Sequence, residues 1–340
     1  MKFSLLRFTN TALLAAVLIL TLTGIYGLFW TLQGWLFDLH RLAGWSLIAL
    51  IPWKTAISWR SLKRGLQPDF DRGVMILVSL LLALLTLLVI VLGVAWLWRL
   101  LPAEAWLRQT LISWHWMLAL ALLAPFALHA WRRWPRPAKP DLLSRRAALK
   151  MLGIGAVSVA GWWLAEQVAA LKALSQAARR FTGSREANSF SGNDFPVTNG
   201  PGEGDQRIEI ETWRLDVEAR GKAAHSYTYQ DLLDLPSEDV TATVDCTLGW
   251  YSTQVWKGIP LRDLIDSIEI QGEVIAVRLE AVSGYAQIFP LQEARQILLA
   301  THVGGETLEH PHGFPLRAVV PSRRGWFWVK WLARIDVIAV

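Results

Sequence analysis

The chain has 340 residues, of which 53% are hydrophobic and 18% charged, and its formal net charge is +6 at pH 7. The length is sufficient for two domains, and the composition is too apolar for a chain that is soluble throughout. The single cysteine, Cys246, excludes an intrachain disulfide. The positive charges lie mainly in short loops between apolar segments, which indicates membrane orientation rather than nucleic-acid binding.

Five apolar segments occupy the first half of the chain, and the stretches 8–37 and 73–98 contain no charged residue. Uncharged apolar stretches of about 20 residues are typical of membrane-spanning helices. We therefore expect five spanning helices in contact with membrane lipid, the first four forming a bundle domain over residues 1–139. The expected helix cores are Thr11–Trp30, His40–Trp59, Gly73–Trp98, Gln109–Trp131 and Met151–Ala165.

Lysine and arginine gather at the N-terminus and in the loops after the second and fourth helices. Loops with this excess of positive charge face the cytoplasm in membrane proteins. The residues concerned are Lys2, Arg7, Arg60, Lys63, Arg64, Arg72, Arg132, Arg133, Arg136, Lys139, Arg145, Arg146 and Lys150. The pattern places the N-terminus inside and, after five crossings, the C-terminus outside. We expect a multi-pass protein of a bacterial inner (cytoplasmic) membrane with a periplasmic C-terminal domain.

A pair of arginines precedes the fifth helix, in the run Ser144–Lys150 with the sequence SRRAALK. Because a moderately apolar stretch with Gly and Ala follows, the run resembles a twin-arginine export signal placed inside the chain. That export route carries folded proteins, which suits a domain that receives a bulky cofactor in the cytoplasm. The alternative is a plain basic stop before a helix. Residues 166–181 are expected to continue the helix, so that 140–181 form the motif, the fifth helix and its extension.

Three histidines lie in the membrane half: His40, His115 and His129. The second and fourth helices run in the same direction, and His40 and His115 both stand near their starts. Their imidazoles are therefore expected at one depth, near the outer face. Two imidazoles on facing helices can bind a haem iron from both sides.

The spacing of these histidines resembles that of the two-haem membrane cytochromes b. His115 and His129 are 14 residues apart, nearly four helical turns, which corresponds to a difference in depth of about 21 Å. The position that would pair with His129 is Lys54, and the first helix has Asn10 where some relatives carry a histidine. Because the inner site lacks one of the usual ligands, we expect one haem b, between His40 and His115 near the outer surface. The alternative is a bundle without haem, in which these histidines lie at helix ends.

Residues 182–206 are rich in Gly, Ser, Asn and Pro and are expected to form a linker that merges into an irregular arm. Beyond it, alternating patterns predict a mixed α+β domain over residues 207–340, to which the arm contributes from about residue 193. The expected strands are Arg207–Glu218, Val240–Cys246, Val274–Val282, Pro315–Pro321 and Val329–Val340, and the expected short helices are Tyr229–Asp234, Pro260–Ile268 and Leu291–Thr301.

Cys246 ends one of these strands and is followed by a turn with large aromatic residues. A lone cysteine is most often a small buried hydrophobe, but here the surrounding motifs follow a characteristic order. They are Asn193–Val197, Trp213–Val217, Tyr229–Leu233, Cys246 with Gly249 and Trp250, Trp256–Leu261, Ser283–Tyr285, His312–Arg317, Val320 with Pro321, Gly325 and Val329–Leu332. On these motifs, the segment from about Phe195 to Val340 resembles the sulfite oxidase family of molybdopterin enzymes, methionine-sulfoxide reductase-like proteins included.

The resemblance implies a sulfite-oxidase-type fold in which Cys246 completes the sulfur ligands of a molybdenum held by the dithiolene of a pterin. A soft thiolate suits such a metal. It also places Tyr285 beside the metal's oxo group, where the hydroxyl can orient substrate oxygen and take part in proton transfer; the alternative is a packed core tyrosine. The implied contacts to the pterin cofactor come from Asn193, His312, Arg317 and Lys330 and from the backbone around Trp328 and Val329.

The alternative for Arg317 and Lys330 is a solvated strand face, but both stand in apolar runs, where a bare charge is costly. Arg323 and Arg324 could join the same site or face solvent.

Two departures from the family pattern concern the substrate. Sulfite oxidases place arginines soon after the cysteine, whereas the run Thr247–Trp256 contains no charge. Ser283 also stands where many bacterial relatives carry an aspartate. A neutral substrate such as a sulfoxide or another S- or N-oxide is therefore expected rather than sulfite or nitrate.

The expected function is a membrane-anchored molybdopterin oxidoreductase that transfers an oxygen atom on a small-molecule substrate. Its electrons are expected to pass through haem b to or from quinone or an external redox carrier. One alternative is a haem-free anchor whose reductase domain is supplied by a separate subunit. Another is a non-catalytic module that binds the cofactor or a partner, its substrate site closed by Trp250, Tyr251 and Trp326.

Overall fold

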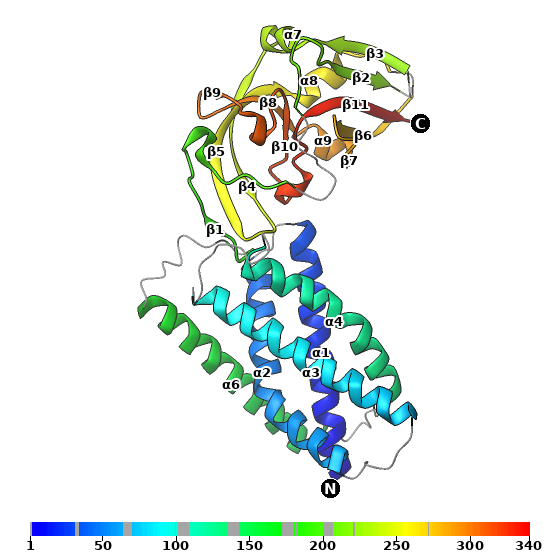
Figure 1. The fold of residues 1–340 in the computed structure, drawn as a ribbon, viewed down its shortest axis with the longest axis vertical. Coiled ribbons are helices and arrows are strands. Elements are labelled where there is room, and N and C mark those ends of the chain that lie inside the picture. The colour runs from blue at the N-terminus through cyan, green and yellow to red at the C-terminus, as the bar shows by residue number, and fades with distance from the viewer. Residues whose placement is uncertain are drawn as a thin grey trace. The chain divides into compact units, whose positions relative to one another are not determined.

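The structure is a computed structural model, and it describes residues 2–30, 34–63, 70–98, 100, 109–134, 143–171, 180, 182–199, 207–219, 222–270 and 272–340. The chain divides into two compact units, the first with Met1–Leu28 and Leu32–Thr182 and the second with Phe29–Thr31 and Gly183–Val340. Helices form the first unit and strands dominate the second (Figure 1).

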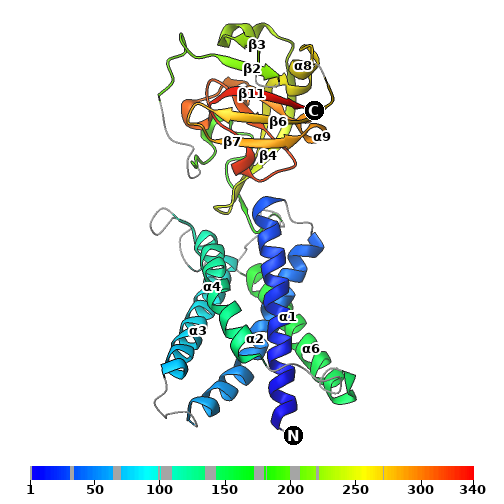
Figure 2. The ribbon, with the colours of Figure 1, turned by 90° about the vertical axis from the view of Figure 1, so that its right-hand side faces the viewer.

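Five long helices make up the first unit, and they cover all five segments expected to be helical. They are α1 (Lys2–Phe29), α2 (Gly34–Lys63), α3 (Phe70–Leu97), α4 (Leu111–Arg133) and α6 (Arg145–Leu171). Helix α3 packs along α4, and α2 packs along α6 (Figure 2). The expected helical extension from 172 to 179 and the basic loops 64–69 and 135–142 lie outside the described residues.

Among the described residues, four helices are long and apolar enough to cross a membrane: α1, α3, α4 and α6. Helix α2 is not one of them, because its 30 residues include Pro52 and Lys54 among many polar and aromatic side chains. On α3, the outward leucines recur every three or four positions and are more than half exposed, as on a helix surrounded by lipid. These are Leu77, Leu80, Leu84 and Leu87.

Polar contacts join α2 to α6. The Ser46 and Ser158 hydroxyl oxygens lie 2.9 Å apart, and Arg41 forms an ion pair with Glu166. Within a bundle of apolar helices such contacts fix which faces meet, because an unpaired polar group is costly in hydrocarbon.

The second unit contains two sheets. The larger has the order β1 (Arg185–Glu186), β5 (Trp250–Pro260), β8 (Leu298–Val303) and β10 (Arg317–Val319), with β4 (Glu238–Asp245) beside β5 and β9 (Glu306–Thr307) beside β8. The five-stranded sheet has the order β3 (Lys222–Tyr227), β2 (Leu215–Ala219), β11 (Leu332–Ala339), β6 (Val274–Ala281) and β7 (Ala286–Pro290) (Figure 2). Strand β1 is parallel to β5 and β11 is parallel to β2, while the other described pairs are antiparallel.

Short helices connect the strands. They are α7 (Tyr229–Asp234), α8 (Leu261–Asp266) and α9 (Leu291–Ala294), with 3-10 turns η2 (Gly192–Asp194), η3 (His310–His312) and η4 (Gly325–Phe327). Thr228 caps α7 because its hydroxyl accepts from the Asp231 backbone N–H while the Asp231 carboxylate accepts from the Thr228 N–H.

A common core fills this unit. Alternating residues of the five-stranded sheet point into it, for example Val277 and Leu279 of β6 and Ile335 and Val337 of β11, all fully buried. Burying each such side chain stabilises the fold by roughly 1.5–3 kcal/mol.

Several expected elements are confirmed in the second unit. Helix α7 has the predicted bounds, and the strands expected around Val240–Cys246, Val274–Val282, Pro315–Pro321 and Val329–Val340 correspond to β4, β6, β10 and β11. Helix α8 lies within the predicted Pro260–Ile268.

Two expected elements are wrong. Residues 207–214 form a loop with a turn, so the first expected strand begins only at Leu215. Leu291–Thr301 is not one helix: α9 ends at Ala294 and β8 begins at Leu298. Strand β8 lies between β5 and β10 and is buried on both faces, so its apolar run shows no alternation.

The arm that precedes the sheets belongs to the second unit from Gly183 onward. The Arg185 N–H donates to the Gly249 carbonyl at 2.9 Å, and the Ala187 N–H donates to the Tyr251 carbonyl at 2.9 Å. The arm is thereby fixed along the start of β5. The expected linker residues 200–206 lie outside the described residues.

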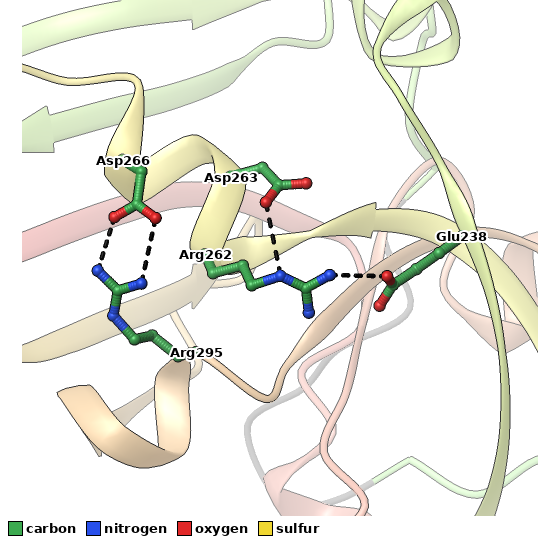
Figure 3. A network of polar contacts seen from close by, with 5 residues as sticks. All are labelled: Glu238, Arg262, Asp263, Asp266 and Arg295. Carbon is green, nitrogen blue, oxygen red and sulfur yellow. Dashed lines mark hydrogen bonds and ion pairs between the residues drawn. The ribbon is translucent and has the colours of Figure 1, made fainter.

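Charged side chains tie α8 to its neighbours at the surface (Figure 3). Arg262 donates to Glu238 of β4 at 2.7 Å, and Arg295 donates to both carboxylate oxygens of Asp266, at 2.6 and 3.1 Å. All of these side chains are partly exposed, so each pair contributes little to stability beyond fixing the orientation of the helix.

Candidate active site

Cys246 lies at the turn between β4 and β5 and is buried. Its N–H donates to the Trp250 carbonyl at 2.8 Å, and its carbonyl accepts from the Gly249 N–H at 3.1 Å. Gly249 adopts a φ of 90°, which a residue with a side chain rarely adopts, so the tight turn depends on this glycine. The turn holds the cysteine at the end of a strand pair rather than in the core cluster.

The Sγ atom of Cys246 accepts a hydrogen bond from the Leu248 N–H at 3.4 Å. Burial raises the pKa of the Cys246 thiol, and the Leu248 N–H and the Arg324 guanidinium counteract part of that shift. A bound metal ion replaces the thiol proton, because the thiolate is the form that binds metals.

Buried polar side chains surround the backbone of Cys246. The Arg324 Nη2 donates to the Cys246 carbonyl at 3.0 Å, and the Ser184 Oγ donates to the Asp245 carboxylate at 2.6 Å. Gly325 packs against the same turn, since a Cβ atom there would lie 3.5 Å from the Cys246 Cα. The segment 324–325 therefore packs against the Cys246 turn.

A second group of buried residues brings together the side chains expected to contact a cofactor. The His312 Nε2 donates to the Asn193 carbonyl at 2.7 Å, and Arg317 donates to the His312 carbonyl at 2.8 Å. Gly313, with a φ of 114°, lies against both Arg317 and Lys330, since a Cβ atom there would lie 3.1–3.2 Å from their side chains. Four of the predicted residues thus lie in one place.

Aromatic rings enclose the Arg317 guanidinium. Its central carbon lies 5.4 Å from the ring centre of Trp256, 5.7 Å from that of Trp328 and 6.0 Å from that of Phe195. Contacts of this kind stabilise a desolvated cation. They explain how an arginine that is 5% exposed can be held in the domain interior.

The arm residues 198–199 join the two groups. The Lys330 Nζ donates to the Thr198 carbonyl at 2.9 Å and to the Asn199 side chain. The Thr198 hydroxyl forms a hydrogen bond with Cys246 and accepts from the Trp250 indole at 3.1 Å. One short segment therefore connects the cysteine to the buried cations.

Trp328 and Val329 follow η4. Trp328 is fully buried, and its indole donates to the Arg323 carbonyl at 3.3 Å. The Val329 N–H donates to Phe327 and its carbonyl accepts from Ala318, so in this structure both backbone groups bond within the protein.

Tyr285 stands at the turn between β6 and β7. Its hydroxyl donates to the Trp326 carbonyl at 2.5 Å and accepts from the Gln287 side chain at 2.8 Å. Trp326 follows Gly325 directly, so η4 contacts the tyrosine turn and the Cys246 turn through adjacent residues.

The predicted histidine pair lies within the helical unit. The ring centres of His40 and His115 are 6.4 Å apart. In each ring Nδ1 is already bonded, in His40 to the Thr23 hydroxyl at 2.8 Å and in His115 to the Val89 carbonyl at 2.8 Å. A Cβ atom on Gly93 would lie 3.1 Å from the His115 ring, so this glycine leaves room for the imidazole.

A second polar layer stands 14 positions along the same helices. The Lys54 Nζ donates to the Asn10 side chain at 3.1 Å, and the His129 Nδ1 lies 3.2 Å from the Ser79 hydroxyl. Lys54, which stands where the cytochrome resemblance would place a partner for His129, therefore bonds to the neighbouring helix α1. Lys54 follows His40 by the same number of residues as His129 follows His115, namely 14.

Three contributors to the site were not singled out from sequence: Ser184, Thr198 and Asp245. They are small polar residues of the arm and of a strand end, with no motif of their own. The sequence did not decide whether Arg323 and Arg324 join the site or face solvent. Arg324 is 4% exposed and lies beside Cys246. Arg323 instead forms a bidentate ion pair with Glu293, at 2.6 and 2.7 Å.

Comparison with known proteins assigns the second unit. Residues 202–340 match the family model described as the oxidoreductase molybdopterin binding domain. The chain is 30% identical over 145 residues to the uncharacterized oxidoreductase YuiH of Bacillus subtilis (strain 168). The match covers 42% of this chain and 73% of that protein. It is also 30% identical over 180 residues to the mitochondrial sulfite oxidase of Rattus norvegicus, covering 44% of this chain and 32% of the relative.

Among solved structures, the sulfane dehydrogenase SoxCD from Paracoccus pantotrophus matches with a TM-score of 0.37 and 25% sequence identity, over 40% of this chain and 41% of that chain. The chain spans about a third of the rat sulfite oxidase that it matches. The site and the sequence relationship define a molybdopterin-dependent oxidoreductase. The chain belongs to the oxidoreductase molybdopterin-binding domain family.

The residues present fit an anionic pterin cofactor. Among the described residues, the buried charged side chains of the second unit are the cations Arg317, Arg324 and Lys330 and the single carboxylate Asp245, with His312 buried beside them. Such an excess of buried positive charge suits a phosphate group. No group of three His, Cys, Asp or Glu side chains in the described part of the chain could hold a metal ion.

Proposed function

We propose that the chain is a membrane-anchored molybdenum oxidoreductase that transfers an oxygen atom to or from a small S- or N-oxide. The observation that carries the proposal is the position of the one thiol, Cys246. It lies beside the buried Arg324, and the arm residue Thr198 connects it to Lys330. Lys330 belongs to a cluster of three basic side chains with His312 and Arg317. When bound, the molybdenum cofactor supplies a two-electron oxidation or reduction with gain or loss of an oxygen atom.

In this proposal the protein divides its tasks between two groups of residues. Asn193, His312, Arg317 and Lys330 hold the pterin and its phosphate, together with the backbone near Trp328 and Val329. Cys246 binds the metal. The buried basic side chains favour the anionic cofactor, and the aromatic rings around Arg317 exclude water from that contact.

Tyr285 supplies a hydroxyl for the substrate oxygen. Its hydrogen bond to the Trp326 carbonyl fixes the ring, and Gln287 donates to the same oxygen. To donate to a substrate, the hydroxyl hydrogen turns from Trp326 toward the substrate oxygen. A neutral substrate is favoured because the run Thr247–Trp256 contains no charge.

We further propose that His40 and His115 bind one haem b. An imidazole–metal bond of about 2 Å on each side of the iron, plus about 1 Å from each nitrogen to its ring centre, puts two axial rings about 6 Å apart. The 6.4 Å spacing of the two ring centres agrees with this value. The hydrogen bonds at the two Nδ1 atoms leave Nε2 of each ring for the iron. They also fix the orientation of each ring, as hydrogen bonds to metal-binding histidines commonly do.

The inner polar layer does not offer a second haem the same ligands, because Lys54 stands opposite His129 and bonds to Asn10. A single haem therefore exchanges electrons with quinone or an external carrier on the outer side. The proposed orientation, with the N-terminus inside and the C-terminal unit outside, requires α2 to cross the membrane as a fifth span. The basic loops after the second and fourth helices and the arginine pair at the start of α6 support it.

The proposal is tested by haem spectroscopy in membranes that contain the full chain. We expect a reduced b-type absorption band that is lost in His40→Ala and in His115→Ala and kept in the matched control His129→Ala. We also expect a sulfoxide, but not nitrate, to reoxidise the reduced band. A band that persists in both of the first two variants contradicts the haem assignment, and reoxidation by nitrate alone contradicts the substrate class.

A further inference from the structure

A buried polar group encloses the backbone of Cys246. Ser184 is 0% exposed, Asp245 1% and Arg324 4%. The Ser184 Oγ lies 2.6 Å from the Asp245 Oδ1 and 3.4 Å from the Cys246 carbonyl oxygen, and the Arg324 Nη1 lies 3.5 Å from the same Oδ1. The three side chains come from the arm, the end of β4 and the residue before η4. Ser184 and Arg324 donate to the Cys246 carbonyl, and the Asp245 carboxylate lies next to both of them.

The residue after Arg324 packs against the end of β4. A Cβ atom on Gly325 would lie 3.2 Å from the Val244 Cγ2 and 3.4 Å from the Asp245 carbonyl oxygen. The backbone at this point is thus close to the Cys246 turn, and the Arg324 guanidinium lies beside the cysteine. Its Nη2 donates to the Cys246 carbonyl at 3.0 Å.

The guanidinium retains unused hydrogen-bonding capacity. Its Nε and Nη1 are buried and form no hydrogen bond among the described residues, although Nη1 is within ion-pair distance of Asp245. Water does not screen a buried charge. The Asp245 carboxylate offsets part of the effect of the guanidinium on Cys246, and the effect of Arg324 is the larger of the two. The remaining positive field acts on the charge at the Cys246 sulfur.

We propose that Arg324 is a positioning residue for the metal-binding thiolate: with Asp245 and Ser184 it fixes the Cys246 turn, and its charge tunes the bound metal. This inference rests on the proposed function, in which Cys246 is the ligand. Positive charge beside a metal disfavours its oxidised, more positive state. The side chain thus raises the reduction potential of the centre without touching the substrate.

The test compares Arg324→Lys and Arg324→Met in the full chain with the cofactor loaded, and Arg295→Met serves as the matched control. Arg295 pairs with Asp266 at the surface and lies in the network of Figure 3, outside the site. The measurements are molybdenum per polypeptide, the midpoint potential of the metal from the paramagnetic signal of its intermediate oxidation state, and kcat and KM separately.

We expect Arg324→Met to lower the midpoint potential and to reduce kcat about ten- to a hundredfold, with KM nearly unchanged, because the variant loses a contact that orients the metal-binding residue. Arg324→Lys keeps the charge and restores the potential, although it cannot reproduce the fork of hydrogen bonds. The control variant keeps all values.

Because Arg324→Met leaves the Asp245 carboxylate buried, the variant can lose its fold. The variant Arg324→Gln also removes the positive charge, but its amide keeps a hydrogen-bond donor for the Asp245 carboxylate. It is expected to fold, to bind molybdenum and to show the lowered potential. An unchanged midpoint potential in a folded, molybdenum-loaded Arg324→Gln variant overturns the inference while leaving the proposed function intact. A wild-type chain without molybdenum overturns the proposed function itself.

Discussion

Individual side chains of the second unit carry more buried charge than a stable core normally tolerates. Arg317 and Lys330 are at most 5% exposed, and both donate to backbone carbonyl groups. Their burial could be expected from sequence, because each stands in an apolar run. The contact of Arg324 with Cys246 could not, because the two residues are 78 positions apart and only the fold brings η4 to the β4–β5 turn.

His312 should make the stability of the second unit depend on pH. Burial and the neighbouring Arg317 lower the pKa of His312 from 6.5 to about 4. Between these values the unfolded chain binds a proton that the folded chain does not, so stability falls as pH falls from about 6.5 to about 4 and then levels off. The expected loss is roughly 3 kcal/mol.

The measurement is the unfolding free energy of the second unit at a series of pH values, for wild type and for His312→Gln. Glutamine keeps a donor for the Asn193 carbonyl but has no group that titrates in this range. The difference between the two profiles isolates His312 from the carboxylates, whose loss of ion pairs acts in the same direction. Parallel profiles would show that His312 is not responsible.

At the scale of elements, strands with a clear pattern were predictable and fully buried strands were not. Strand β6 shows alternating burial and was expected at nearly its observed bounds. Strand β8 was expected as a helix, because its first residues, Leu298–Ala300, form an unbroken apolar run that carries no period of two. Strand β5 was missed because its residues begin inside the aromatic turn that follows Cys246.

The antiparallel pairing of β5 with β8 depends on Gly258. A Cβ atom there would lie 2.0 Å from the Leu299 carbonyl oxygen and 2.6 Å from the Ala300 Cα, and the two strands change register at this point. We expect Gly258→Ala to destabilise the second unit by about 3 kcal/mol or more, because backbone atoms must move.

Thermal unfolding of the second unit, followed by tryptophan fluorescence, measures the effect of Gly258→Ala. Gly155→Ala is the control, because no atom lies within 4 Å of the added Cβ and the position belongs to the other unit. Equal transition temperatures for the two variants would contradict the role of Gly258 in the pairing of β5 with β8.

In the helical unit, the sequence pattern was sufficient to locate the helices, but it did not show which of them are long and apolar enough to cross a membrane. All five expected segments are helical, and four of them meet the length and composition of a membrane span. The histidine spacing predicted that His40 and His115 lie at one level, and their rings are neighbours. The Thr23 and Val89 partners of the rings could not be foreseen, because they depend on how the helices are rotated.

For the whole molecule, the proposed function assigns oxygen transfer to the second unit and electron exchange to the first. The second unit belongs to a molybdopterin-binding oxidoreductase family, and the first offers apolar helices with a histidine pair. The whole account depends on the bond between the Cys246 sulfur and the metal, since only that bond connects the site geometry to the chemistry.

Elemental analysis of the purified full chain tests this bond most directly. We expect about one molybdenum per polypeptide in the wild type, and a large loss of molybdenum together with oxygen-transfer activity in Cys246→Ser. The serine is nearly isosteric, so the fold and any haem band should persist. Equal molybdenum content and equal activity in the two proteins would contradict the account.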